Sequence, residues 1–138
     1  MFIVIIGCGR TGSLLAGNLS RSGHEVVVIE NNAESFSLLP VDFSGFQIEG
    51  DAAENDILKE GKIESADLVI VSTGNDQINY LVSQMAKINF DVPRIMVRTI
   101  DPAVEKMYKN ENKVESFSQI SLLADNMISK IEQEGMSL

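Results

Sequence analysis

The sequence predicts an α/β fold: a doubly wound sheet of about six parallel strands with helices on both faces. Short apolar, β-branched stretches alternate along the chain with segments of helical periodicity. Several strand candidates are continuous apolar runs, as is typical of strands whose two faces are both covered in a parallel sheet. The length of 138 residues suits a single folded body with a sizeable core.

The elements follow in a regular order. Strands are expected at 2–6, 25–30, 45–50, 67–73, 94–99 and 114–118, and helices at 11–22, 53–60, 76–89 and 103–110. Right-handed crossovers between them give the doubly wound sheet. Leu15 and Leu19 share one face of the first helix. The helix 76–89 is expected to bury one stripe of apolar residues, made of Ile78, Leu81, Val82, Met85 and Ile88.

Composition excludes several classes of function. The formal net charge is −9, and the 11 Lys and Arg residues are scattered, so a nucleic-acid partner is not expected. One Cys and one His exclude a disulfide framework and a metal-ligand cluster. No apolar run approaches the roughly 18 residues of a membrane span, and no basic leader precedes the first strand. We therefore expect a cytoplasmic body without a cleaved signal.

The stretch GCGRTG, residues 7–12, lies between the first strand and the first helix. Gly7 permits a tight turn, Gly9 lets the backbone approach a phosphate, and Gly12 lets the helix pack close to the strand. Glu30 ends the second strand, 18 positions after Gly12. This context indicates a Rossmann-like nucleotide-binding unit. The alternative is a glycine turn beside an ordinary acidic strand end.

Glu30 also predicts which nucleotides are excluded. Its carboxylate can accept hydrogen bonds from both ribose hydroxyls and would repel a 2′-phosphate. Asn31 and Asn32 supply no arginine to meet such a phosphate. NADP is therefore disfavoured.

Other candidate contacts follow the later strands. Asp51 follows the third strand, where it can accept from an adenine amino group, cap the helix 53–60, or do both. Thr73 and Gly74 should border the same crevice. Asp76 can equally be a helix cap or a contact, and Asn79 can face phosphate or, more in keeping with the sequence, solvent.

Two arginines are further candidates. Arg98 ends the fifth strand, where it can pair with phosphate or form a surface salt bridge. Arg10, inside the glycine loop, should project near the phosphates or into a neighbouring subunit, because its burial would be costly. His24 reads as a turn residue at the opposite end of the sheet, and Cys8 as a small packing residue. No catalytic residue is expected.

Three stretches together resemble the RCK_N domain, also called the KTN or TrkA N-terminal domain. They are VIIGCGRTGSLLAGNLSRSGHEVVVIENN, GDAAENDILKEGKIESADLVIVSTGNDQINYLVSQMAK and PRIMVRTIDP, and the likeness covers roughly residues 1–131. The resemblance implies a Rossmann-like domain that binds NAD(H), ATP, ADP or AMP. It also implies dimers assembled into a ring that regulates a membrane potassium transporter of the Trk or Ktr type.

The resemblance assigns positions to the site. Gly7, Gly9 and Gly12 fall on the phosphate loop, and Glu30 falls on a ribose-binding acid that is usually Asp. Arg10 falls on a loop arginine that can reach a phosphate, sometimes across the dimer interface. The full set of candidate cofactor contacts is Gly7, Gly9, Arg10, Thr11, Gly12, Glu30, Asn31, Asp51, Ala52, Thr73, Gly74, Asn79 and Arg98.

The sequence departs from the family near residue 114. The family's sixth strand reads GAD-x-VI-x-P, whereas this chain has NKVESFSQIS. We expect a nucleotide-binding domain at 1–117 and a crossover helix at 118–138, with no RCK_C domain after it. The chain is then either a fragment or a minimal subunit that needs a separate RCK_C-containing partner. The family implies that this helix crosses to a partner subunit, while the alternative is packing on its own sheet. Its apolar stripe is Ile120, Leu123, Met127, Ile128 and Ile131.

The expected function is a nucleotide-sensing regulatory subunit of a potassium transport system, lying at the inner face of the membrane through its partner. It is expected to bind nucleotide without catalysing a reaction. Two alternatives stay open: the cofactor-binding half of an NAD-dependent oxidoreductase, and a Rossmann regulatory module for another partner.

Overall fold

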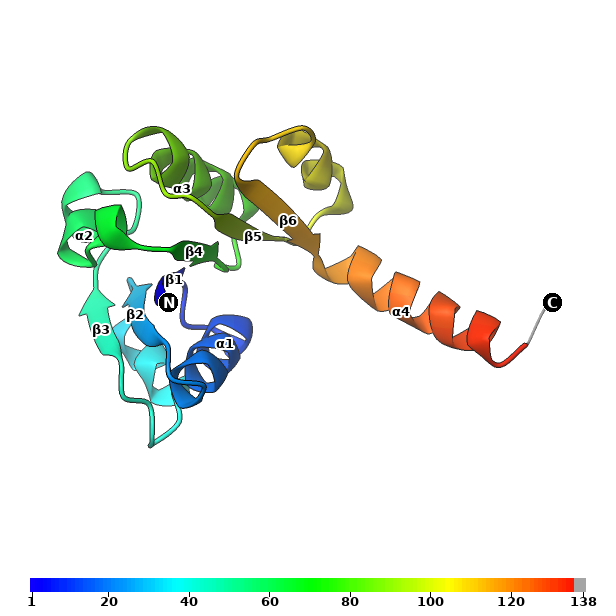
Figure 1. Cartoon of the computed structure of the whole chain (residues 1–138), viewed down its shortest axis with the longest axis horizontal. Coiled ribbons are helices and arrows are strands. Elements are labelled where there is room, and N and C mark those ends of the chain that lie inside the picture. Colours follow the sequence, from blue (N-terminus) through cyan, green and yellow to red (C-terminus); the bar gives the residue numbers. More distant parts are fainter. Residues whose placement is uncertain (136–138) are drawn as a thin grey trace.

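The computed structural model describes residues 1–135 and has the predicted α/β fold. Six parallel strands form one sheet in the order β3-β2-β1-β4-β5-β6 (Figure 1). Each strand lies within one residue of its predicted range, except that β4 ends two residues early. The strands are β1 (Phe2–Ile6), β2 (Glu25–Glu30), β3 (Phe46–Glu49), β4 (Leu68–Val71), β5 (Ile95–Thr99) and β6 (Val114–Ser118).

The central strands are buried on both faces, as their continuous apolar sequences predict. Ile6 at the end of β1 is aligned with Ile29 of β2 on one side and Val71 of β4 on the other. The carboxyl ends of these strands therefore meet at one edge of the sheet. In a doubly wound fold this edge forms the ligand crevice.

Helices cover the two faces unequally. On one face lie α1 (Arg10–Arg21) and the 3-10 helix η1 (Ala33–Leu38), packed against the first half of the sheet. On the other face lie α2 (Asn55–Glu60), η2 (Ile63–Ser65), α3 (Asp76–Ile88) and η3 (Pro102–Tyr108). The predicted helix 53–60 thus begins later, and the predicted helix 103–110 is a 3-10 helix.

The buried face of α3 differs from the predicted stripe. Val82 is buried and Ile78 and Met85 pack against the core, but Leu81 and Ile88 are 45% and 73% exposed. The fully buried positions include the small residues Ser83 and Ala86, which let α3 lie close to the sheet.

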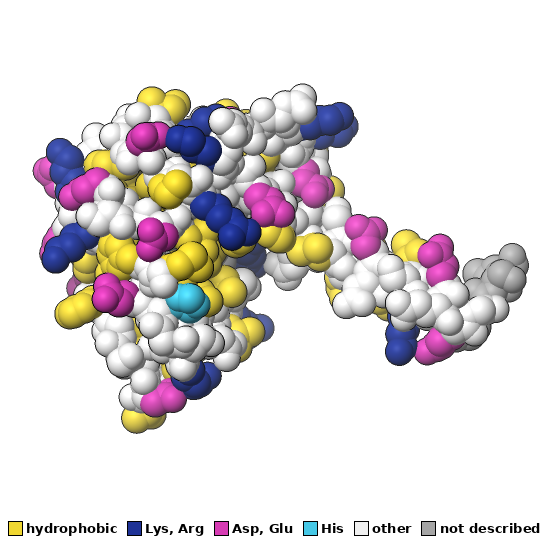
Figure 2. Space-filling view, in the orientation of Figure 1, with side chains coloured by type: hydrophobic (Ala, Val, Ile, Leu, Met, Phe, Trp, Pro, Cys, Tyr) yellow, Lys and Arg dark blue, Asp and Glu magenta, His cyan; other side chains and the backbone are white. Residues whose placement is uncertain are grey.

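The last helix, α4 (Gln119–Gln133), projects from the end of β6 away from the body (Figure 1). None of its residues is buried. The alternative of packing on its own sheet is therefore wrong. Figure 2 shows the arm standing clear of the body with hydrophobic, basic and acidic side chains along it. Residues 136–138 of the predicted 118–138 helix lie outside the described residues, and the division into two domains stays a prediction.

Candidate functional site

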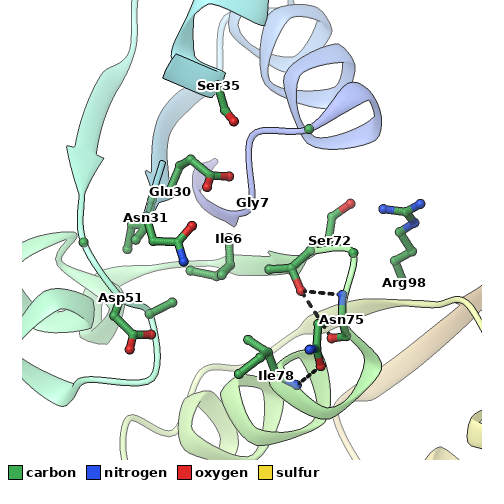
Figure 3. Close-up of a pocket in the computed structure, with 16 residues that line it drawn as sticks. Ile6, Gly7, Glu30, Asn31, Ser35, Asp51, Ser72, Asn75, Ile78 and Arg98 are labelled. Atoms are coloured by element: carbon green, nitrogen blue, oxygen red, sulfur yellow. Dashed lines mark hydrogen bonds between the residues drawn. The ribbon is translucent and has the colours of Figure 1, made fainter. Parts of the chain in front are cut away.

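A cavity of about 440 Å³ lies at the carboxyl edge of the sheet (Figure 3). Its walls come from the ends of β1 to β5 and the loops that follow them. Nine of the thirteen predicted site residues line it: Gly7, Gly9, Glu30, Asn31, Asp51, Ala52, Thr73, Gly74 and Arg98. The structure thus brings together most of the residues that the sequence singled out, from five separate segments.

The three glycines of the loop have different surroundings. Gly7 has a φ of 101°, and a Cβ there would lie 2.9 Å from the Ser72 carbonyl oxygen. A Cβ on Gly12 would collide with the Gly7 carbonyl, so Gly12 allows α1 to approach β1. Around Gly9 no atom lies within 4 Å of an added Cβ. Gly9 is therefore the glycine whose missing side chain leaves open space beside the cavity.

Gly9 is also the N-cap of α1, and no side chain caps the helix there. The first N–H groups of a helix have no acceptor within it. Together with the helix dipole, these donors favour a negative group at this end of the cavity.

The Glu30 carboxylate joins two loops at the cavity wall. One oxygen, Oε1, accepts from the Cys8 backbone N–H at 2.8 Å, and Oε2 accepts from the Asn32 N–H at 3.0 Å. Each carboxylate oxygen has a second lone pair, so the group can still accept from a ligand hydroxyl. Glu30 thus both shapes the glycine loop and faces the cavity.

Cys8 is buried beside this carboxylate, as expected of a packing residue. Its thiol lies 3.5 Å from the Ser35 carbonyl oxygen, to which it donates. Burial, and then the negative charge of Glu30, raise the pKa of Cys8 to about 11. The thiol is therefore protonated at neutral pH and a poor nucleophile.

Asp51 lines the cavity but does not cap a helix. Its Oδ1 accepts from the Ala53 N–H at 2.9 Å, which closes a local turn. Helix α2 begins at Asn55, with Glu54 as its N-cap. The capping prediction is wrong because the chain makes this turn before the helix starts.

Asn79 was expected to face solvent or phosphate. The prediction that it faces solvent is wrong, because the residue is fully buried. Its amide nitrogen donates to the carbonyl oxygens of Thr73 at 3.0 Å and Arg98 at 3.1 Å. Its amide oxygen accepts from the Thr73 N–H at 3.1 Å. Asn79 does not line the cavity; it fixes the backbone of two residues that do.

Asp76 has a similar bridging role. The N-cap of α3 is Asn75, so the capping prediction for Asp76 is wrong. Its carboxylate instead accepts from the backbone N–H groups of Ile100 at 2.8 Å and Asp101 at 2.9 Å. The loop after β5 is thereby held against the start of α3.

Arg98 was expected either to pair with phosphate or to form a surface salt bridge. It forms no salt bridge within residues 1–135, so the second interpretation is wrong. Its Nε and Nη2 atoms donate to Gln119 Oε1 at 3.3 and 2.9 Å. The side chain lines the main cavity and also a second, mostly apolar cavity of about 320 Å³. Among the described residues, Arg98 is the one positively charged side chain that lines the main cavity.

Three other predicted contacts lie outside the main cavity. Arg10 is exposed and borders a separate hollow on the outer side of α1, together with Leu14 and Arg21. Thr11 borders the second cavity. Gly12 is buried against the loop. A free arginine at a helix start can point either way, and here it points away from the cavity.

Seven residues that line the cavity were missed. Ile6 and Ile29 lie at or next to the ends of their strands, a position that sequence reasoning could have used. Ser35 belongs to an unpredicted 3-10 helix, and no pattern marks it. The missed residues are Ile6, Ile29, Ser35, Gly50, Ser72, Asn75 and Ile78.

Other features bear on alternative functions. His24 Nδ1 lies 3.0 Å from the N-terminal nitrogen, in the turn before β2 and away from the cavity. Among residues 1–135 no group of three or more His, Cys, Asp or Glu side chains is placed to hold a metal ion. Nor does any helix in that range have the length and apolar character needed to cross a membrane.

A sequence model of the TrkA-N domain matches residues 3–119, most of the chain. The chain belongs to the TrkA-N domain family. It is 32% identical over 135 residues to the Trk system potassium uptake protein TrkA of Streptomyces coelicolor, covering 98% of this chain and 60% of that protein. It is 36% identical over 123 residues to a TrkA homolog of Pyrococcus abyssi, covering 87% and 53%. The chain thus spans little more than half the length of these relatives.

Solved structures share the TrkA-N fold. The TrkA-N domain of the inner membrane protein ybaL from Escherichia coli superposes with a TM-score of 0.82 at 21% identity, covering 94% of this chain and 96% of that one. A GsuK channel bound to NAD gives 0.78 at 24% identity, covering 97% and 24%. An AMP-bound Kef C-terminal domain from Shewanella denitrificans gives 0.77 at 19% identity, covering 99% and 84%. These likenesses establish the fold.

Proposed function

We propose that this chain is the nucleotide-sensing part of a potassium uptake system and binds an adenosine phosphate, either NAD(H) or ATP, ADP or AMP. One observation carries the proposal: Gly9, Glu30, Asp51 and Arg98 surround a single 440 Å³ cavity in a TrkA-N chain. Related and similar proteins are named as potassium uptake proteins or were solved with NAD, ADP or AMP.

The proposed contacts follow the chemistry of the walls. The phosphates lie at the open side of Gly9 and the start of α1, where unpaired N–H groups and the helix dipole favour anions. Glu30 accepts from the ribose hydroxyls, and Asp51 from the adenine amino group. Asn31, Ala52, Thr73 and Gly74 complete the walls, while Asn79 acts through the backbone of Thr73 and Arg98, which it holds.

The negative charge of Glu30 disfavours a 2′-phosphate. The residues that line the ribose end with it, including Asn31 and Ser35, carry no positive charge. NADP would therefore place two negative groups together without a counter-charge, and we propose no role for it.

The partners are also part of the proposal. The apolar stripe of α4 is 44–63% exposed, which is typical of a surface that another subunit covers. We assign it to a homo-oligomer, a dimer or ring of dimers, in which Arg10 faces the neighbouring subunit. The assembly acts on a membrane potassium transporter from the cytoplasmic side, with or without a separate RCK_C-containing subunit. No chemical reaction is assigned to the site.

Isothermal titration tests the proposal. The purified chain is titrated with NAD⁺, NADH, ATP, ADP and AMP, with NADP⁺ as the matched control that differs from NAD⁺ by one phosphate. We expect micromolar binding of one or more of the first five and much weaker binding of NADP⁺. Absence of binding to all five would contradict the proposal, and oxidation or reduction of the cofactor with a small substrate would favour the oxidoreductase instead.

A further inference from the structure

Arg98 connects the main cavity to the arm α4. It lies near the end of β5, and its guanidinium is at the cavity wall (Figure 3). The same group donates two hydrogen bonds, of 2.9 and 3.3 Å, to the side-chain oxygen of Gln119. Gln119 is the first residue of α4. One side chain thus touches both the proposed ligand site and the base of the arm.

The base of α4 is held by few other interactions. None of the helix is buried. Ser118 caps its first turn by accepting from the Ser121 N–H at 3.2 Å, and the Ser121 hydroxyl donates to Glu105 at 3.4 Å. Because no residue of α4 is buried, the two hydrogen bonds from Arg98 to Gln119 are among the few interactions that hold its base.

The two cavities meet where Arg98 lies. Ser72 and Arg98 line both of them, and Gln119 and Leu122 of α4 line only the second. The Ser72 hydroxyl is buried and has no hydrogen-bond partner among the described residues. The Ser72 hydroxyl is therefore available to accept a hydrogen bond from the guanidinium if the Arg98 side chain shifts toward the main cavity.

The present acceptor of Arg98 is weak for a cation. Gln119 offers a neutral amide oxygen, whereas a phosphate oxygen carries negative charge, so a phosphate adds Coulomb attraction to the hydrogen bond and can bind the guanidinium through two parallel bonds. A phosphate that enters the main cavity therefore competes favourably for the guanidinium.

We infer that a phosphate of the bound ligand draws Arg98 away from Gln119 and so frees the base of α4. This inference rests on the proposed nucleotide site and adds how the site is read out. By linkage, a substitution at Gln119 that strengthens its bond to Arg98 weakens ligand binding, and one that weakens this bond strengthens ligand binding.

A pair of substitutions at Gln119 tests the competition. Gln119→Ala removes the competing acceptor, and Gln119→Glu replaces it with a charged one. We expect ADP to bind about threefold more tightly to Gln119→Ala and about threefold more weakly to Gln119→Glu than to the unaltered chain. Adenosine, which has no phosphate, is the control ligand, and its affinity should be the same in all three proteins.

Amide hydrogen exchange supplies the second measurement. With saturating ADP, the backbone amides of residues 119–123 should exchange faster than with saturating adenosine. Equal exchange, or weaker ADP binding in both variants, would overturn the inference, because Gln119 would then orient Arg98 for the ligand. Equal ADP affinity in all three proteins would overturn it while leaving the nucleotide site intact. Failure of the unaltered chain to bind any adenosine phosphate would overturn the proposed function itself.

Discussion

Substitution of two glycines of the same loop by alanine separates ligand binding from folding. A methyl group on Gly9 meets no atom within 4 Å, and the residue has φ −80° and ψ −159°, which alanine adopts freely. A methyl group on Gly12 would overlap the backbone carbonyl of Gly7, which cannot move without shifting the loop. The two variants carry the same added atom, so their difference reports only where it lies.

The expected magnitudes follow from these surroundings. Gly9→Ala should change the free energy of unfolding by no more than about 0.5 kcal/mol, as is usual for a site with no contacts. Gly12→Ala should lower it by about 3 kcal/mol, because α1 must move away from β1 to relieve the overlap. Binding of ADP should fall more than tenfold in Gly9→Ala, since the methyl group occupies the space through which a phosphate reaches the backbone.

Urea unfolding followed by circular dichroism gives the stability of each variant, and isothermal titration with ADP gives the affinity. The comparison needs no assumption about the transporter. If Gly9→Ala binds ADP as the unaltered chain does, the loop is a structural turn and the phosphate position is wrong. If Gly12→Ala is as stable as the unaltered chain, the close approach of α1 to β1 is wrong.

Three further outcomes are expected. Glu30→Ala should lower stability by about 2 kcal/mol, because the Cys8 N–H loses its acceptor, and weaken ADP binding more than tenfold; unchanged affinity in calorimetry would remove Glu30 from the site. Burial raises the pKa of Cys8 to about 11 in the folded chain, so the folded state binds this proton more tightly than the unfolded state does. The resulting stabilisation is fully present below about pH 9 and is lost as pH rises toward 11. Urea midpoints across that range should fall in the unaltered chain and less in Cys8→Ala. Leu123→Glu should shift the chain toward monomer in analytical ultracentrifugation, and the exposed Lys130→Glu is its control.

The sequence was sufficient for the sheet because each central strand is an unbroken apolar run that only a doubly covered parallel sheet can bury. It was also sufficient for much of the cavity. Strand ends of a parallel sheet share one edge, so residues such as Glu30, Asp51 and Thr73 converge once the order of strands is known. Local pattern and topology together fix these positions without any side-chain detail.

The roles of Asn79 and Asp76 could not be predicted in the same way. Both lie on the first turn of α3, and a polar residue there is usually solvated or caps its own helix. Here they bind backbone groups far along the chain. Asn79 binds the Arg98 carbonyl in β5, 19 positions away. Asp76 binds the N–H groups of Ile100 and Asp101 in the loop after β5. Such bonds depend on how closely two loops approach in space, and hydrophobic periodicity carries no information about that distance.

The side-chain directions of Arg10 and Arg98 could not be predicted from the sequence either. Each follows a motif that places its backbone well, but a long side chain can turn to either side of that backbone. Arg98 turns to an uncharged oxygen at the base of α4, and Arg10 turns to the outer side of α1. Neither arginine has a carboxylate partner within residues 1–135. Arg98, a cation without a counter-charge among these residues, lines the cavity, and an arm with an exposed apolar stripe begins beside it. The proposed ligand site and the exposed stripe of the arm are thus joined through one side chain, Arg98, and its hydrogen bonds to Gln119.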